Sequence, residues 1–196
     1  MAEYGVAKFI VPGERESGDQ HLVCCNESGV LVAAIDGIGH GAEAARAARA
    51  AIAVLRNGVG EPIISLVTAC HEKLRSTRGV VLSLASLDVK HGLMTWLGVG
   101  NVKGVLVRAD KKVGLETLLL RGGVVGDHVP QLQAAVIPVS QGDLLVFATD
   151  GIRTDFVSTL SALENPQRAA ERVMKSFCNQ SDDALVLALR FTGIHR

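Results

Sequence analysis

Several short runs of this chain are apolar at nearly every position. The runs VLVAAI (30–35), DLLVFAT (143–149) and ALVLALRF (184–191) lack the polar alternation of a strand with one wetted face. Such runs fit strands that are covered on both faces. Further layers must therefore pack against the sheets that contain them.

Short β-like runs of this kind, about nine in all, are separated by Gly, Asn, Asp or Pro. The predicted strands are GVAKFIV (5–11), HLVCC (21–25), VLVAAI (30–35), VVLSLASLD (80–88), LMTWLGV (93–99), VKGVLVRA (102–109), LETLLL (115–120), DLLVFAT (143–149) and ALVLALRF (184–191). The segment GGVVGDHVP (122–130) is predicted to be an irregular loop.

Three stretches show helical periodicity: residues 42–57, residues 62–74, and a third that follows the cap Asn165 and the first-turn Pro166. The first two are expected to lie side by side. The helices cluster after the third strand and before the last, so the βα alternation of a doubly wound fold is missing. We therefore expect an α+β fold with antiparallel sheets. No linker, repeat or charge run marks a boundary, which predicts a single domain over residues 1–196.

The composition excludes several classes of partner and mechanism. Lys+Arg and Asp+Glu number 20 each, so the net charge favours neither a nucleic acid nor an anionic membrane. No apolar run approaches the roughly 18 to 20 residues that span a bilayer, and the N-terminus lacks the pattern of a secretory signal. The four cysteines have neither zinc nor disulfide spacing, which predicts reduced thiols in the cytoplasm. None is followed six positions later by Arg, so the CxxxxxR arrangement of thiolate phosphatases is absent.

The segment VLVAAIDGIGHGAEAA (30–45) is the most informative for function. A buried strand ends in Asp36 and is followed by Gly37, Gly39 and Gly41 before a helix begins. Glycines let the backbone approach a ligand closely and leave carbonyl oxygens accessible to a hard cation. This arrangement suits magnesium or manganese.

Three further carboxylates stand at the ends of predicted strands. Asp150 follows an apolar strand, Asp182 precedes the last strand together with Asp183, and Asp19 precedes the second. Carboxylates gathered closely repel one another and raise one another's pKa unless cations neutralise them. Oxygen ligands without HExxH or a Cys pair favour Mg²⁺ or Mn²⁺, and two such ions can activate water against a phosphate.

The ordered strings SGD (17–19), AIDGIGHG (34–41), ATDGI (148–152) and SDDALVL (181–187) resemble the PPM-type metal-dependent protein phosphatases, in their bacterial SpoIIE and RsbX branch. The resemblance covers essentially the whole chain. It implies an αββα four-layer sandwich of two antiparallel sheets flanked by helices, with the metals at one edge. It also implies a protein-serine/threonine phosphatase that acts as a monomer on phosphorylated STAS-domain proteins of a stressosome or partner-switching pathway.

The resemblance also implies a ligand set for two Mn²⁺ or Mg²⁺ ions. Asp36 bridges both cations, the Gly37 carbonyl joins one, and Asp150 and Asp182 hold the other. Asp19 hydrogen-bonds a water of the metal centre. This chain departs from larger relatives at Gly18, where they carry an acidic residue. Arg15 is a candidate contact for the phosphate by its position alone.

Other polar residues near these motifs have simpler interpretations. Asp183 is expected to cap the backbone or face solvent, because adjacent side chains at a strand start point in opposite directions. His40, between glycines, is expected to be exposed or outside the ligand set. Arg46, Arg49 and Arg56 share one helix face, which is either solvated or a docking surface for an acidic partner.

Two alternative functions remain open at this point. Residues 37–41 superficially resemble the glycine loop of a dinucleotide-binding oxidoreductase, but GxGxxG requires a third glycine at position 42, which is Ala42. The other alternative is a catalytically inactive regulatory module of the same fold. The presence of all the principal carboxylates disfavours it.

Overall fold

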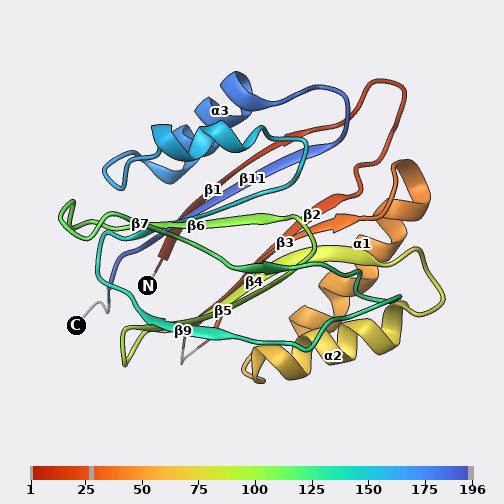
Figure 1. Cartoon of the computed structure of the whole chain (residues 1–196), viewed down its shortest axis with the longest axis horizontal. Coiled ribbons are helices and arrows are strands. Elements are labelled where there is room, and N and C mark those ends of the chain that lie inside the picture. The colour runs from red at the N-terminus through yellow and green to blue at the C-terminus, as the bar shows by residue number, and fades with distance from the viewer. Residues whose placement is uncertain (1, 27–28, 194–196) are drawn as a thin grey trace.

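Two β-sheets pack face to face in the computed structural model, which describes residues 2–26 and 29–193 (Figure 1). The five-stranded sheet has the order β1-β11-β10-β6-β7, and the six-stranded sheet consists of β2-β3-β4-β5-β8 with β9 paired to β5. The strands are β1 (Ala2–Phe9), β2 (Asp19–Cys25), β3 (Gly29–Gly37), β4 (Val80–Asp88), β5 (Leu93–Val99), β6 (Lys103–Val107), β7 (Leu115–Thr117), β8 (Leu120–Arg121), β9 (Ala135–Pro138), β10 (Leu144–Ala148) and β11 (Ala184–Phe191).

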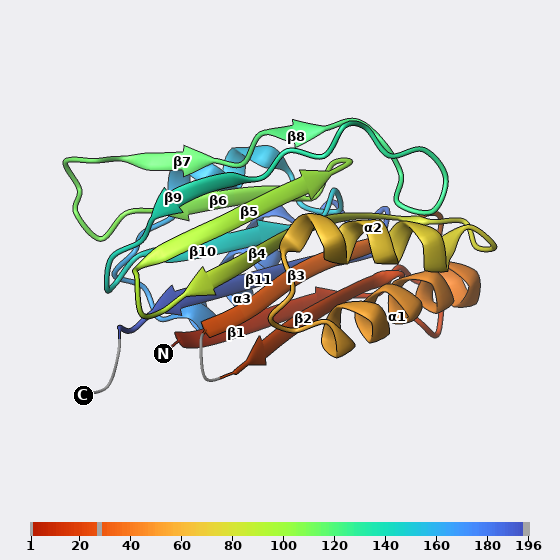
Figure 2. The ribbon, with the colours of Figure 1, turned by 90° about the horizontal axis from the view of Figure 1, so that it is seen from below.

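Helices cover the outer face of each sheet. The helices α1 (Gly41–Asn57) and α2 (Ile63–Leu74) lie side by side on the six-stranded sheet, as Figure 2 shows. The helix α3 (Pro166–Phe177) and the 3₁₀ helix η1 (Thr154–Thr159) cover the five-stranded sheet. Asn165 caps α3 as predicted, accepting hydrogen bonds from the backbone N–H of Gln167 and Arg168. The predicted α+β sandwich is therefore confirmed.

Three layers of apolar side chains hold this arrangement together. The middle layer fills the space between the sheets and includes Val32, Phe147, Leu187 and Trp96. A second layer lies between the six-stranded sheet and α1 and α2, and a third between the five-stranded sheet and α3. The strands β3, β10 and β11 are buried at nearly every position, because each contributes side chains to two of these layers. This confirms that the apolar runs are covered on both faces.

The structure differs from the predicted elements in several respects, beginning with strand bounds such as those of β1, Ala2–Phe9 against the predicted 5–11. The predicted strand LETLLL (115–120) is divided, because β7 pairs with β6 in one sheet whereas β8 pairs with β5 in the other. The pair β5–β8 is parallel, whereas the other strand pairs are antiparallel. The strand β9 and the helix η1 were not predicted from the sequence. The loop 122–130 is irregular as predicted and is joined to β4 by a single bridge between Val80 and Val125.

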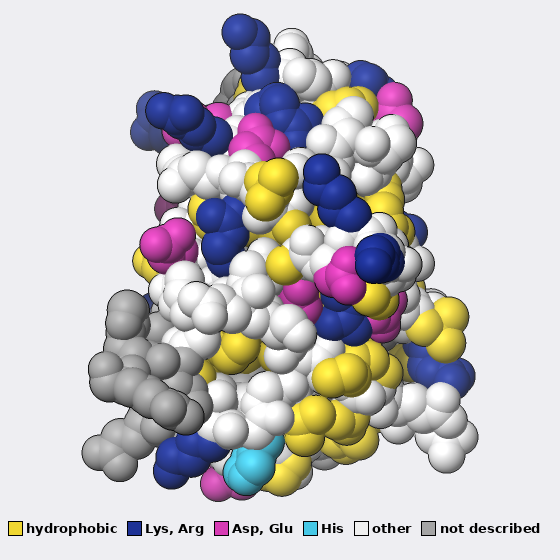
Figure 3. Space-filling view, turned by 90° about the vertical axis from the view of Figure 1, so that its left-hand side faces the viewer, with side chains coloured by type: hydrophobic (Ala, Val, Ile, Leu, Met, Phe, Trp, Pro, Cys, Tyr) yellow, Lys and Arg dark blue, Asp and Glu magenta, His cyan; other side chains and the backbone are white. Residues whose placement is uncertain are grey.

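The loops that carry the predicted site meet at one end of the sandwich, on the right in Figure 1. They are the loops after β1, β3 and β10 and the loop before β11. Figure 3 shows the opposite end, where Lys and Arg side chains are separated by acidic and apolar ones. Within the part of the chain that the structure describes, no helix combines the length and apolarity needed to cross a bilayer.

Candidate metal centre

Asp19 and Asp36 are placed together by the pairing of two strands. They are directly opposite each other in the register of β2 and β3. The next residue, Gly37, donates its backbone N–H to the carbonyl oxygen of Gly18 at 3.1 Å. Asp19 is buried, with 2% of its surface exposed, and Asp36 is partly buried. Both carboxylates therefore lie at the end of the six-stranded sheet.

Asp150 and Asp182 come from the other sheet. Asp150 follows β10 and Asp182 lies two residues before β11, and both side chains are exposed. Their segments are tightly packed, because a Cβ on Gly151 would lie 2.1 Å from the carbonyl oxygen of Asp183. The predicted ligand residues thus come from both sheets and meet at one end of the sandwich.

The carboxylates in this cluster influence one another electrostatically. Burial, and after it the charges of neighbouring carboxylates, raises the pKa of Asp36 to about 8; the contributing neighbours are Asp19, Asp150, Asp182 and Asp183. Burial raises the pKa of Asp19 to about 7, although a hydrogen bond from Thr149 acts in the opposite direction. A cation placed among these groups would favour their ionised forms and relieve the repulsion.

Two of the carboxylates are held by local donors rather than turned toward a shared point. Asp150 Oδ2 accepts a hydrogen bond from Asn101 Nδ2 at 2.9 Å, and Asp182 Oδ1 accepts one from the backbone N–H of Asp183 at 2.8 Å. As the side chains stand, no three His, Cys, Asp or Glu residues within 2–26 and 29–193 could hold one metal ion. In this arrangement Asp150 and Asp182 each have a hydrogen-bond partner outside the predicted ligand set.

Comparison with known proteins identifies the family. The model of the family described as "Stage II sporulation protein E (SpoIIE)" matches residues 26–192. The chain belongs to the SpoIIE family. This confirms the resemblance seen in the four sequence motifs.

Two kinds of relative support this membership. The phosphoserine phosphatase RsbX of Bacillus subtilis (strain 168) is 24% identical over 94 residues, and the match spans about half of each protein, 48% of this chain and 47% of RsbX. A solved chain described as "The bacterial stressosome: a modular system that has been adapted to control secondary messenger signaling" is 30% identical, with a TM-score of 0.88 over 97% of this chain and 100% of that one. A crystal structure of RsbX in complex with magnesium shares the fold, with 19% identity and a TM-score of 0.86 over 96% of this chain and 94% of that one.

Three glycines in this SpoIIE-family chain are required by close packing. A Cβ on Gly37 would lie 2.2 Å from the carbonyl oxygen of Ala44 in α1. Gly39 and Gly41 have φ values of +92° and +72°, a region that side-chain-bearing residues rarely adopt. The side chains of Arg78 and Glu14 lie against these two glycines. The loop is therefore held between α1 and two polar side chains.

Thr149, which sequence analysis did not single out, and Asp183, which it expected only to cap the backbone or face solvent, both support the candidate centre. Asp183 is 4% exposed, and its carboxylate accepts the backbone N–H of Val11 at 2.9 Å and of Gly18 at 2.7 Å. It caps backbone groups, which is one of the two roles expected from the sequence, and it is buried rather than solvated. Thr149 donates its hydroxyl to Asp19 at 2.6 Å and accepts the N–H of Leu185 at 2.8 Å. In the sequence, the only features that could have pointed to these two residues are the paired Asp before the last strand and the Thr directly before Asp150.

The other candidates occupy the rim of this end or lie outside it. His40 is exposed as predicted, and its Nδ1 lies 2.7 Å from Glu14. Arg15 is exposed on the loop before β2. Arg46, Arg49 and Arg56 are exposed along α1, and Arg49 pairs with Glu16 at 2.7 Å. The four cysteines are free thiols, which agrees with the sequence prediction.

The residues present fit hard divalent cations. The candidate ligands are the carboxylates of Asp36, Asp150 and Asp182 and the carbonyl oxygen of Gly37, which are all oxygen donors. The pKa of Asp36 is raised mainly by burial and further by the charges of neighbouring carboxylates, and a nearby cation would oppose both effects. The magnesium-bound RsbX structure has the same fold.

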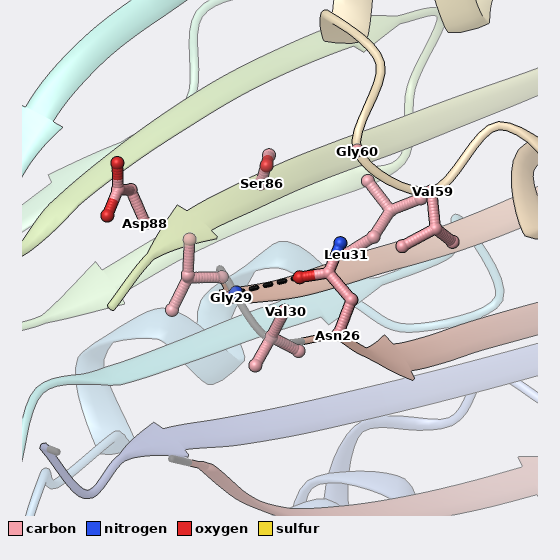
Figure 4. Close-up of a pocket in the computed structure, with 9 residues that line it drawn as sticks. Asn26, Gly29, Val30, Leu31, Val59, Gly60, Ser86 and Asp88 are labelled. Carbon is pink, nitrogen blue, oxygen red and sulfur yellow. Dashed lines mark hydrogen bonds between the residues drawn. The ribbon is translucent and has the colours of Figure 1, made fainter. Parts of the chain in front are cut away.

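A separate cavity lies at the other end of the six-stranded sheet (Figure 4). It has a volume of about 190 Å³ and is lined by the β2–β3 turn, the α1–α2 loop and the end of β4. Strands of nine residues separate it from the carboxylates by roughly 25 Å. Its Asp88 is already bonded to the backbone of Lys90 and to His91. This cavity is therefore not part of the candidate centre.

Proposed function

We propose that this chain is a metal-dependent serine/threonine phosphoprotein phosphatase. One observation carries the proposal. Four segments of the chain bring carboxylates to the same end of the sandwich, namely those of Asp19, Asp36, Asp150 and Asp182. Family membership and the phosphoserine phosphatase name of RsbX support the same activity.

The metal ligands are assigned as the family resemblance implies. Asp36 would be shared by two Mn²⁺ or Mg²⁺ ions, Gly37 would join one through its carbonyl, and Asp150 and Asp182 would hold the other. Such ions supply Lewis-acid chemistry, lowering the pKa of water and withdrawing charge from phosphate oxygens. The positions of two of these donors are determined by local structure. The pairing of β2 with β3 positions Asp36, and close packing against α1 positions Gly37.

Asp19 has a different role in this proposal. Its carboxylate is buried and held by the hydroxyl of Thr149, so it cannot turn freely. Burial raises its pKa to about 7 without metal, and cations bound nearby would favour its ionised form, which can accept a hydrogen bond from water. We assign it to orienting the attacking water by a hydrogen bond.

Phosphorylated STAS-domain proteins are the proposed substrates. The support is the stressosome description of the 30% identical chain, together with the likeness to RsbX. We also propose that residues 1–196 act as one monomeric phosphatase domain in the cytoplasm, where its free thiols would stay reduced.

The deciding experiment incubates the protein with candidate phospho-STAS proteins and Mn²⁺ or Mg²⁺ while phosphate release is followed. We expect release that stops with a chelator and is lost in Asp36→Asn. A folded, metal-loaded protein that releases phosphate from no phosphoprotein and from no p-nitrophenyl phosphate would favour the inactive regulatory module instead.

The dinucleotide-binding alternative is not supported. A dinucleotide fold needs the glycine loop to connect parallel strands through a helix. Here β3 is flanked by β2 and β4, both antiparallel to it. The carboxylate of Glu14 also lies against Gly41, where a pyrophosphate would be repelled.

A further inference from the structure

Arg78 is held against the loop that follows Asp36. It precedes β4, and the carbonyl oxygen of its neighbour Gly79 accepts the N–H of Ile38 at 3.1 Å. A Cβ on Gly39 would lie 2.7 Å from Arg78 Nη1, so the guanidinium group packs directly on the glycine backbone. Its Nη2 pairs with Glu43 of α1 at 2.6 Å. Arg78 therefore contacts both the loop that follows Asp36 and the first turn of α1.

The end of the molecule that carries Arg78 is rich in carboxylates. The carboxylates at this end of the molecule are those of Glu14, Asp19, Asp36, Glu43, Asp150, Asp182 and Asp183. A phosphate monoester carries close to two negative charges at neutral pH and would be repelled by them. A guanidinium group at the rim offsets this repulsion and can donate two parallel hydrogen bonds to phosphate oxygens.

Arg78 is also available to a ligand. Its side chain is 55% exposed and that of Glu43 is 57% exposed. The Nη2 of Arg78 is the atom that pairs with Glu43, and its Nη1 lies against Gly39. An ion pair this exposed contributes little to stability, so a phosphate oxygen can replace or join Glu43 at small cost.

We propose that Arg78 binds the phosphate group of the substrate in the phosphatase reaction. This inference rests on the proposed function and adds a residue that the sequence motifs did not indicate. Among the arginines at this end, Arg49 pairs with Glu16, whereas Arg78 packs on Gly39 of the glycine loop itself.

Binding of inorganic phosphate to the magnesium-loaded protein, measured by calorimetry, tests this assignment. Arg78→Ala should weaken binding about 10- to 100-fold, as expected for loss of a charge-assisted contact, and Arg78→Lys should recover part of it. Arg75→Ala is the matched control, because Arg75 is 63% exposed and pairs with Glu72 three residues away. Unchanged phosphate affinity in Arg78→Ala would overturn the proposal.

A second variant tests whether Arg78 binds phosphate or whether the Arg78–Glu43 pair only stabilises the glycine loop. Glu43→Gln removes the ion pair but leaves the guanidinium in place. If Arg78 binds phosphate, Glu43→Gln should keep or improve phosphate affinity while Arg78→Ala weakens it. Equal losses in both variants would mean that the pair only holds the loop and would reject the assignment.

Kinetics with p-nitrophenyl phosphate distinguish this inference from the proposed function. Arg78→Ala should raise KM for this small substrate and for a phosphoprotein by similar factors, because the contact is to the phosphoryl group that both share. An increase for the phosphoprotein alone would make Arg78 a protein-docking residue and contradict the proposal. A parent protein that binds phosphate through Arg78 but hydrolyses neither substrate would instead refute the phosphatase activity.

Discussion

Replacement of Asp36 by Asn should stabilise the metal-free protein at alkaline pH. The carboxyl of Asp36 has a pKa of about 8 in the folded protein, against 3.8 as its ordinary value. The folded state therefore keeps a proton that the unfolded state loses as pH rises from about 4 to about 8. The contribution of Asp36 to the free energy of unfolding is therefore full below about pH 4 and is lost as pH rises through this interval. Asn cannot ionise, so the variant avoids the loss.

The size of the effect follows from the pKa difference. One pKa unit corresponds to about 1.4 kcal/mol, so the rise from 3.8 to about 8 sets a ceiling of about 6 kcal/mol on the free energy of unfolding. Burial is the main cause of the rise, but Asp36 is only partly buried and the neighbouring Asp150 and Asp182 are exposed to solvent, so we expect about 2 to 3 kcal/mol above pH 8. For a chain of this length that corresponds to roughly 4 to 12 °C in Tm.

Thermal melts in chelator at pH 5, 7 and 9 measure this difference. The gap in Tm between Asp36→Asn and the parent should widen with pH, whereas Asp127→Asn, an exposed control, should show no such trend. Added Mn²⁺ should then stabilise the parent more than the variant. A Tm gap that is the same at all three pH values, or equal Mn²⁺ affinity in both proteins, would refute this account of Asp36.

Three further predictions follow from the same region. Asp183→Asn should lower the free energy of unfolding by about 1 to 3 kcal/mol in denaturant melts. The carboxylate accepts the Val11 and Gly18 N–H groups on separate oxygens, whereas an amide has one oxygen and would leave one N–H group without its partner. Single Ser variants of the four cysteines should retain activity in a phosphatase assay; burial raises the pKa of the Cys70 thiol to about 12, far from a nucleophilic thiolate. Exhaustive chelation should abolish turnover of p-nitrophenyl phosphate, and Mn²⁺ should restore it.

The sequence was sufficient to predict where the main carboxylates lie. Asp36 and Asp150 each follow a short apolar run that was predicted to be a buried strand, so their placement at strand ends follows from local pattern. The same reasoning predicted α3, whose cap Asn165 and first-turn Pro166 act within the helix itself. These features depend on neighbours in the chain, which a single sequence displays.

Features that depend on distant contacts could not be predicted in this way. The hydrogen bond from Thr149 to Asp19 joins residues 130 positions apart. The run LETLLL is apolar enough for one strand, but Leu118 bonds to Gly104 in one sheet while Leu120 pairs with Gly98 in the other. The strand β9 is largely exposed and exists through its pairing with β5. Strand pairing of this kind is set by the whole fold rather than by local pattern.

The division of the candidate ligands between the two sheets has a structural consequence. Asp19 and Asp36 belong to the six-stranded sheet, whereas Asp150 and Asp182 flank β10 and β11 of the five-stranded one. The Thr149–Asp19 hydrogen bond already crosses between them. A cation that shares Asp36 with Asp150 would cross the same boundary, so its binding energy would oppose separation of the sheets. Because unfolding must separate the sheets, metal binding at this end should stabilise the whole sandwich rather than the loops alone.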